Sequence, residues 1–285
     1  MTRSRRSLHL SCGVILAAAL MLAGCGTDDD DPDAPDPTPT VSSEAPSTTA
    51  PTTMTGVYYV VDTRTGVRLA RELRDVAEDR APEAAVAAMI EGAVDPDYAT
   101  TWNPATEVLD VSEESGGITV DLSDDARTAN VGSEGAARMV QQLVYTVTEA
   151  LDEDAGVTLL IEGEPAGELW GVVSWDEPVG RADPLDVRVL VQIDSPQEGL
   201  VTSSPLRIEG EAAVFEATLG WRVLDADGQE VQAGFTTTEE GQTFAPFAFP
   251  VELEPGTYSV EITEDDPSGG EGGTPMTDTR TVIIE

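Results

Sequence analysis

The stretch MVQQLVYTVTEAL, residues 139–151, decides the fold of the first half of this chain. Its large apolar residues recur every three or four positions, which is the spacing of one face of an α-helix. These residues are Val140, Leu143, Val144, Val147 and Leu151. A helix of this kind buries its apolar stripe against a sheet or another helix. We therefore expect a helix from about Ser133 to Leu151.

Short β-rich runs and one further helix surround this stretch. The segment PEAAVAAMIEGAV, residues 82–94, predicts the other helix, with Pro82 in its first turn. Alternating apolar residues predict strands at 57–61, 67–73, 108–111, 118–122 and 157–161. The order β-β-α-β-β-α-β indicates an α+β domain over residues 57–185, with both helices on one side of a sheet.

The remaining residues, 186–285, show the period of strands and no helical period. About seven alternating runs are separated by turn signals such as Asp225-Ala226-Asp227-Gly228. This pattern is typical of an all-β immunoglobulin-like sandwich. The segment lacks the Cys…Trp…Cys spacing of antibody domains, so we expect no disulfide between its sheets.

The first 24 residues have the features of an export signal. Arg3, Arg5 and Arg6 precede the apolar run 13–24, which is shorter than the ~20 residues that a membrane-spanning helix needs. Leu22-Ala23-Gly24-Cys25 resembles a bacterial lipobox. That resemblance implies cleavage between Gly24 and Cys25 and a diacylglyceryl thioether on Cys25.

The lipobox interpretation predicts a lipoprotein at the extracytoplasmic face of the cell membrane, held there by the lipid on Cys25. The alternative is an ordinary signal peptide that is cut elsewhere. The export route, general or twin-Arg, stays open. Residues 25–56 are acidic and rich in Pro and Thr, and we expect them to form a disordered tether.

Charge restricts the partners of this protein. The formal charge is −39, from 54 acidic and 15 basic residues, and every basic residue is Arg. Such a chain repels nucleic acid, so no nucleic-acid partner is expected. The acidity also fits a well-solvated surface that resists aggregation.

The residue types that remain after cleavage restrict the chemistry. His9, the only His, would leave with the leader, no Lys occurs, and Cys25 would be the only Cys. Common catalytic arrangements therefore cannot form, and we expect no enzyme activity and no cofactor. A carboxylate-dependent wall hydrolase is the enzymatic alternative. Asp225 and Asp227 are weak calcium candidates, because paired acids also shape hairpin turns.

Two tryptophans suggest a second function. Trp170 and Trp175 lie in GELWGVVSW near the expected domain junction. Aromatic rings can stack on sugars, so these side chains could form a platform for peptidoglycan or another polysaccharide. The other interpretation is that both rings pack in the core.

Both expected domains resemble known families. VYYVV, PEAAVAAMIEGAV, GITVDLS, MVQQLVYTVTEAL and VTLLIEGEPAGELWG are similar to the GerM-type domain of sporulation and germination proteins. IDSPQEGLVTSSPLRIEGEAAVFEATLGWRVLDADGQEV resembles the immunoglobulin-like domain of bacterial spore germination. The first family has no established catalytic residues. The resemblance implies an envelope lipoprotein whose two domains bind an envelope protein or a cell-wall glycan.

Overall fold

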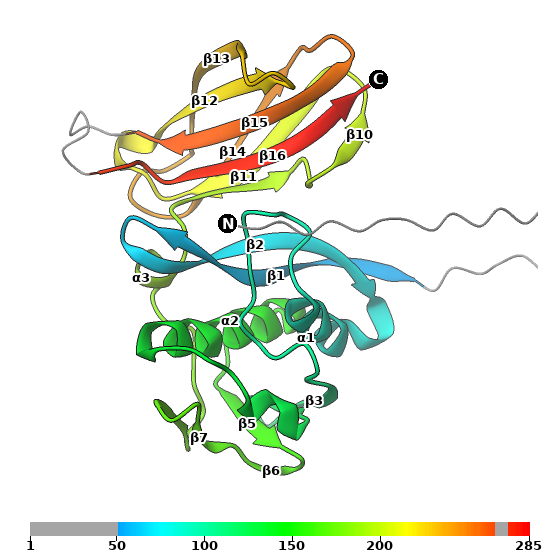
Figure 1. The fold of residues 1–285 in the computed structure, drawn as a ribbon, viewed down its shortest axis with the longest axis vertical. Coiled ribbons are helices and arrows are strands. Elements are labelled where there is room, and N and C mark those ends of the chain that lie inside the picture. Colours follow the sequence, from blue (N-terminus) through cyan, green and yellow to red (C-terminus); the bar gives the residue numbers. More distant parts are fainter. Residues whose placement is uncertain (1–50, 266–272) are drawn as a thin grey trace, which may run out of the picture. The chain divides into compact units, whose positions relative to one another are not determined.

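The structure, a computed structural model, describes residues 51–265 and 273–285 (Figure 1). These residues belong to one compact unit, Thr48–Glu285. The expected signal peptide and residues 25–50 of the expected tether lie outside the described residues. No helix within the described part is both long enough and apolar enough to cross a membrane.

The first domain is α+β, as predicted. Its helices are α1 (Ala81–Glu91) and α2 (Ser133–Leu151), with short 3₁₀ turns at Glu78–Arg80 and Asp124–Arg127. Its strands are β1 (Thr52–Thr63), β2 (Gly66–Ala77), β3 (Val108–Glu114), β4 (Gly117–Leu122), β5 (Val157–Ile161), β6 (Glu164–Pro165), β7 (Gly167–Leu169) and β8 (Val173–Trp175).

The arrangement of these elements differs from the expected single sheet. Strands β1 and β2 form a hairpin, and β3-β4-β5-β6 form a separate sheet. Figure 1 shows α1 and α2 between the hairpin and the four-stranded sheet. Every residue of α2 from Met139 to Thr148 is buried, because both faces of the helix are covered. The helices therefore form a middle layer.

The second domain is the predicted β-sandwich. A five-stranded sheet has the order β10-β16-β15-β12-β13, and a three-stranded sheet has the order β14-β11-β9. Apolar residues of both sheets, among them Ile208, Val223, Phe247 and Val260, form one core. The strands are β9 (Val191–Ser195), β10 (Leu200–Thr202), β11 (Leu206–Ala212), β12 (Thr218–Asp225), β13 (Glu230–Thr237), β14 (Ala245–Val251), β15 (Gly256–Glu264) and β16 (Thr277–Ile284).

Two boundaries differ from the sequence prediction. Strand β1 begins at Thr52, inside the range 25–56 expected to be a disordered tether. Residues 52–56 pair with residues 73–77 of β2, so they extend the hairpin. The all-β domain was expected to begin at residue 186. Instead the short helix α3 (Pro184–Val187) comes first, and β9 starts only at Val191.

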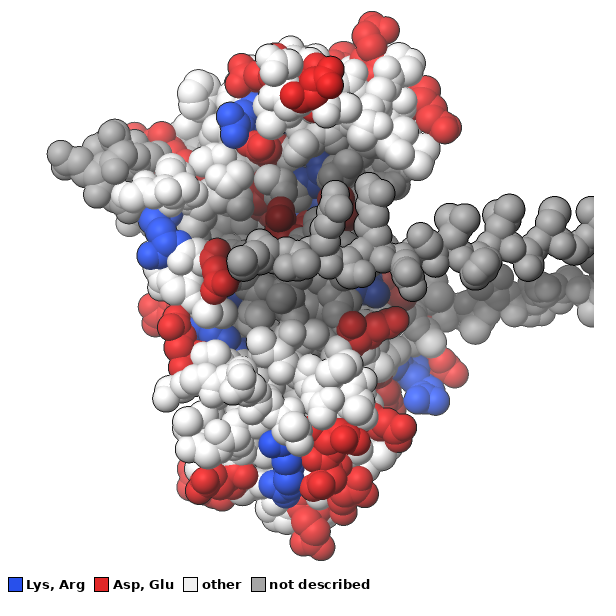
Figure 2. Space-filling model, in the orientation of Figure 1, with Lys and Arg blue, Asp and Glu red and all other residues white. Residues whose placement is uncertain are grey.

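Acidic side chains outnumber basic ones on the face of the molecule that Figure 2 shows. This agrees with the composition of the whole chain, in which 54 residues are acidic and 15 are basic. Most of the described arginines form ion pairs with carboxylates, and several of these pairs are buried where the two domains meet.

Candidate functional site

Side chains from other elements close both outer edges of the hairpin β1–β2. On β1, the Tyr58 N–H donates to Thr146 Oγ1 at 3.0 Å, and the Tyr58 carbonyl accepts from Gln142 Nε2 at 3.0 Å. On β2, the Arg71 N–H donates to Gln192 Oε1 at 2.7 Å, and the Arg71 carbonyl accepts from Gln192 Nε2 at 2.8 Å. Buried backbone groups need such partners. Gln192 lies on β9, so it joins the second domain to the hairpin of the first.

The Arg71 side chain forms the centre of a charged cluster at the contact between the two domains, which we call the joint. Its Nη2 lies 2.8 Å and 2.7 Å from the two carboxylate oxygens of Asp194, and 3.0 Å from Glu211 Oε1. Its Nη1 lies 3.4 Å from Glu149 Oε1 on α2. Asp194 and Glu211 belong to β9 and β11, so one guanidinium binds carboxylates of both domains. Charge-assisted contacts of this geometry are among the strongest polar interactions in proteins.

The pKa values of these carboxyls reflect burial and the neighbouring arginines. Burial raises the pKa of Asp194, although Arg71 opposes that change. Burial would also raise the pKa of Glu211, but Arg188 and Arg71 together hold it below its ordinary value. Arg188 pairs with Glu211 and lies over the rings of Tyr58 and Phe244. Glu211 therefore stays charged between two arginines.

A second cluster surrounds Arg280 of β16, whose side chain is 3% exposed. Its Nη1 lies 2.6 Å from Asp95 Oδ2 and 2.9 Å from Asp278 Oδ1. Its Nη2 donates to the Tyr98 hydroxyl at 3.0 Å and to the Ile193 carbonyl at 2.9 Å. Asp95 and Tyr98 follow α1 in the first domain, so this cluster also spans the joint.

Burial dominates the titration of the carboxyls in this second cluster. It raises the pKa of Asp95 to about 6, with Arg280 acting in the opposite direction. It also raises the pKa of Asp278, against Arg280 and the hydroxyl of Tyr98, which donates to Asp278 Oδ1 at 2.6 Å. Removing one partner of such a buried pair costs several kcal/mol, because the other charge stays buried.

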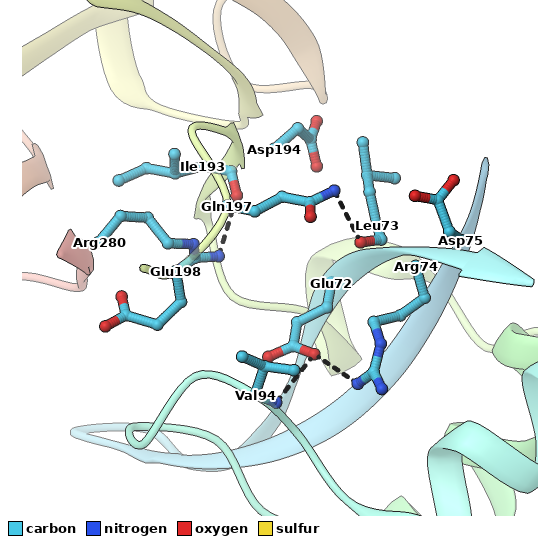
Figure 3. Close-up of a pocket in the computed structure, with 10 residues that line it drawn as sticks. All are labelled: Glu72, Leu73, Arg74, Asp75, Val94, Ile193, Asp194, Gln197, Glu198 and Arg280. Atoms are coloured by element: carbon cyan, nitrogen blue, oxygen red, sulfur yellow. Dashed lines mark hydrogen bonds and ion pairs between the residues drawn. The ribbon is translucent and has the colours of Figure 1, made fainter. Parts of the chain in front are cut away.

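A small pocket of about 250 Å³ opens between the two clusters (Figure 3). Glu72 lies at its wall and accepts from the N–H groups of Asp95 and Val94, at 2.7 Å and 3.2 Å. Gln197 crosses from the second domain to the Leu73 carbonyl at 3.0 Å. The polar groups around the pocket thus connect the two domains. Its volume is below the ~300 Å³ at which small-molecule sites usually begin.

The hypothesis of a tryptophan platform is corrected for Trp175. Its ring is 2% exposed, and its Nε1 donates to the Val157 carbonyl at 3.0 Å. A ring in the core cannot stack on a sugar. Trp170 is half-buried, donates to the Ala126 carbonyl at 3.0 Å, and packs edge-to-face on Trp102 with ring centroids 5.5 Å apart. The two rings therefore form no shared platform.

Asp225 organises the turn between β12 and β13. Its Oδ1 accepts from the N–H groups of Asp227 and Gln229, both at 2.9 Å, and its carbonyl accepts from the Gly228 N–H at 2.9 Å. This is the local bonding by which Asp favours turns. Across the described residues, 51–265 and 273–285, no group of three or more His, Cys, Asp or Glu side chains could hold a metal ion. Gly24 and Cys25 lie outside that part of the chain, so lipidation stays a prediction.

Sequence reasoning missed the two arginine clusters, although one signal for them was present. Asp278 and Arg280 alternate with Val282 and Ile284, so a period of two places all four on the core-facing side of one strand. Charged residues at core positions are rarely fully buried unless they are paired. That pattern predicts a buried ion pair in β16. Nothing in the local sequence identifies Asp95 as the partner from the first domain.

Two family matches agree with this architecture. Residues 56–167 match the family described as "Sporulation and spore germination". Residues 190–271 match the "Immunoglobulin-like domain of bacterial spore germination". The chain thus combines a GerM-type domain of sporulation and germination proteins with the immunoglobulin-like domain of bacterial spore germination. The resemblance found in the sequence is confirmed.

Solved structures of low sequence identity are also similar to parts of the chain. The tandem GerMN domains of the sporulation protein GerM from Bacillus subtilis are 18% identical, with a TM-score of 0.40, and the match covers 46% of each chain. The first of these domains alone is 19% identical, with a TM-score of 0.37, over 46% of this chain and 99% of that one. A "Putative Lipoprotein" from Clostridium perfringens is 14% identical, with a TM-score of 0.33, over 48% of this chain and 93% of that one.

The match spans about half the length of the tandem-domain structure. Among curated proteins, none is similar enough in sequence to count as a match.

Proposed function

We propose that this protein is an extracytoplasmic lipoprotein that presents a two-domain, non-catalytic binding unit at the outer face of the cell membrane. Leu22-Ala23-Gly24-Cys25 supports the anchor, and the family supports a process related to sporulation or germination. The observation that carries the proposal is the joint itself. Arg71 and Arg280 each bind carboxylates of both domains.

A fixed joint favours binding by a surface that uses both domains. Two domains that move independently lose conformational freedom when they bind one partner together, and that loss weakens the complex. Here Gln192 extends the hydrogen bonding of β2, and the two clusters hold β9 and β16 against the first domain. The unit is therefore organised before a partner arrives.

Metabolic labelling tests the anchor. Cells that express the full chain are grown with labelled palmitate and separated into membrane and soluble fractions. We expect label and membrane retention for the wild type and for Cys12→Ser, which changes the other Cys of the sequence. Cys25→Ser should lose the label and leave the membrane or remain unprocessed. An unlabelled wild type that stays in the membrane would overturn the anchor.

Co-purification tests the binding unit. The tagged, membrane-extracted full chain is compared with Arg280→Ala, which loosens the joint, and with Arg207→Ala, whose side chain is 65% exposed. We expect an envelope partner to be captured by the wild type and by Arg207→Ala, and capture by Arg280→Ala to fall at least tenfold. Circular dichroism confirms that each variant is folded. Equal capture by all three chains would show that the joint plays no part in binding.

A further inference from the structure

One exposed face of the second domain carries few charged residues. The strand register places the same face of β16, β15, β12 and β13 in continuous rows. One row runs Thr279, Glu261, Arg222 and Ala233. The neighbouring rows hold threonine, serine, glycine and apolar residues, with Glu230 at the end of the edge strand β13. We call this surface the outer sheet face. Glu261 and Arg222 form an ion pair at its centre, and the third charged residue, Glu230, lies at its edge.

Large apolar side chains stand out from the outer sheet face at both ends of the sheet. Phe235 of β13 is 78% exposed, Val201 of β10 is 50% exposed and Ile283 of β16 is 38% exposed. Val201 and Ile283 are register partners in neighbouring strands, so they form one patch. Apolar side chains that gather on a charge-poor surface mark sites of protein contact.

The charge of the whole chain makes this face unusual. The chain carries 54 acidic residues among 285, yet the rows described above hold two acids: Glu261, which Arg222 neutralises, and Glu230 at the edge of the sheet. Acidic residues lie instead at the rim, where Asp97 accepts from the Thr279 hydroxyl and Glu198 accepts from the Thr281 N–H. A neutral centre with a polar rim is the usual anatomy of an interface. A cationic partner would find nothing to bind at the centre.

The central ion pair indicates what covers the face. Arg222 and Glu261 are register partners on neighbouring strands, and the Arg222 side chain is 53% exposed. A two-fold axis between them would place Arg222 of one copy over Glu261 of a second copy, and the reverse. The face is thus complementary to itself in charge, which a symmetric dimer interface requires.

The size of the face agrees with such a contact. Five strands at ~4.8 Å spacing and about seven residues at ~3.3 Å give roughly 550 Å² of sheet per copy. Two copies would then bury on the order of 1,100 Å², which is near the lower limit for a specific interface. Sheets pack face to face in this way within sandwiches.

We propose that the outer sheet face is the interface of a reversible homodimer, in which the five-stranded sheets of two copies pack on each other about a two-fold axis. Arg222 of each copy pairs with Glu261 of the other. Phe235, Val201 and Ile283 lose their exposure to water there.

Charge exchange between copies tests this proposal. Sedimentation equilibrium is measured on the full, membrane-extracted protein in a density-matched detergent, at 0.15 M salt so that the net charges are screened. We expect a dimer for the wild type, and at least a tenfold weaker one for Arg222→Glu and for Glu261→Arg, because each places like charges opposite each other. An equal mixture of the two variants should dimerise within about threefold of the wild type, because opposite charges then face each other.

The control is Arg207→Glu, which reverses the sign in another exposed ion pair, with Glu209 on β11. It should dimerise like the wild type. A monomeric wild type at 100 μM, a dimer that neither charge reversal weakens, or a mixture no better than its components would overturn the proposal. The mixture also controls for folding, since only folded chains can restore the contact.

Discussion

Gln192 connects the two domains through a single side chain. It is fully buried, and its amide bonds both backbone groups of Arg71, as a neighbouring strand would. We predict that Gln192→Leu lowers the free energy of unfolding by about 2–5 kcal/mol, because two buried backbone groups lose their partners. Urea unfolding measures the change. Gln229→Leu, at an exposed turn position, should change it by less than ~0.5 kcal/mol. Equal effects of the two substitutions would contradict this role.

Gly210 allows the close approach of β11 and β9. A Cβ atom at this position would lie 2.0 Å from the Gln192 carbonyl oxygen, which is backbone and cannot move away easily. Gly210→Ala should therefore lower the free energy of unfolding by about 3 kcal/mol or more. Gly180→Ala is the matched control, because a Cβ there meets nothing within 4 Å. A stable Gly210→Ala protein would show that the two strands can separate at little cost.

Asp95 makes stability depend on pH. Burial raises its pKa from 3.8 to about 6, so the folded state binds this proton more tightly than the unfolded chain does. This group therefore lowers the free energy of unfolding as pH rises from about 4 to about 6. Asn cannot bind this proton, so the Asp95→Asn protein does not lose this contribution as pH rises. Between pH 4 and pH 6, its free energy of unfolding should therefore increase relative to that of the wild type by up to ~3 kcal/mol.

Urea unfolding at pH 4 and pH 7 measures the pH effect, with exposed Asp79→Asn as the control. Parallel pH profiles for Asp95→Asn and the wild type would contradict a raised pKa at this position.

Helix α2 has a buried polar face beside its apolar one. Thr146 accepts from the Tyr58 N–H in the edge of β1, and it is fully buried. Thr146→Val keeps the shape of the side chain but removes the acceptor. We expect a loss of about 1–3 kcal/mol in the free energy of unfolding and faster hydrogen exchange at the Tyr58 amide. Thr128→Val, at an exposed site, should change neither quantity. Unchanged exchange at Tyr58 would contradict this account.

The positions of the helices and strands could be predicted from the sequence better than the way in which they stack in layers. The apolar stripe of α2 and the alternation in β4 follow from local periodicity, and both elements form where expected. Periodicity shows which face is apolar but not whether the opposite face is covered. Gln142 and Thr146 therefore resemble a solvated face, although both side chains lie against the hairpin. The extension of β1 to Thr52 was missed for a similar reason, because its partner strand supplies the hydrogen bonds.

The candidate functional residues could be predicted only where adjacent residues in the sequence determine their chemistry. The lipobox is read from four adjacent residues, and lipidation of Cys25 stays a prediction. Whether a ring is buried depends on distant parts of the chain, so Trp175 could not be assigned to the core by its neighbours in sequence. Likewise the ion pair of Asp95 and Arg280 joins residues 185 positions apart. A single sequence gives the charges but not which of them meet.

At the scale of the whole molecule, the joint determines how the two domains behave. Each has its own apolar core, and either could unfold alone if the joint were weak. The clusters around Arg71 and Arg280 couple the two domains. If the domains separated, charges that are now buried would lose their partners or be exposed to water. We therefore expect these side chains to make the two domains unfold cooperatively, and loss of one arginine should uncouple the two cores.

Differential scanning calorimetry of the full-length protein tests this coupling most directly. We predict one transition for the wild type, with a calorimetric enthalpy equal to the van't Hoff enthalpy. Arg280→Ala should give two transitions, and Arg207→Ala should behave as the wild type does. Two separate transitions in the wild type, or a single unshifted transition in Arg280→Ala, would contradict the claim that the two domains form one unit.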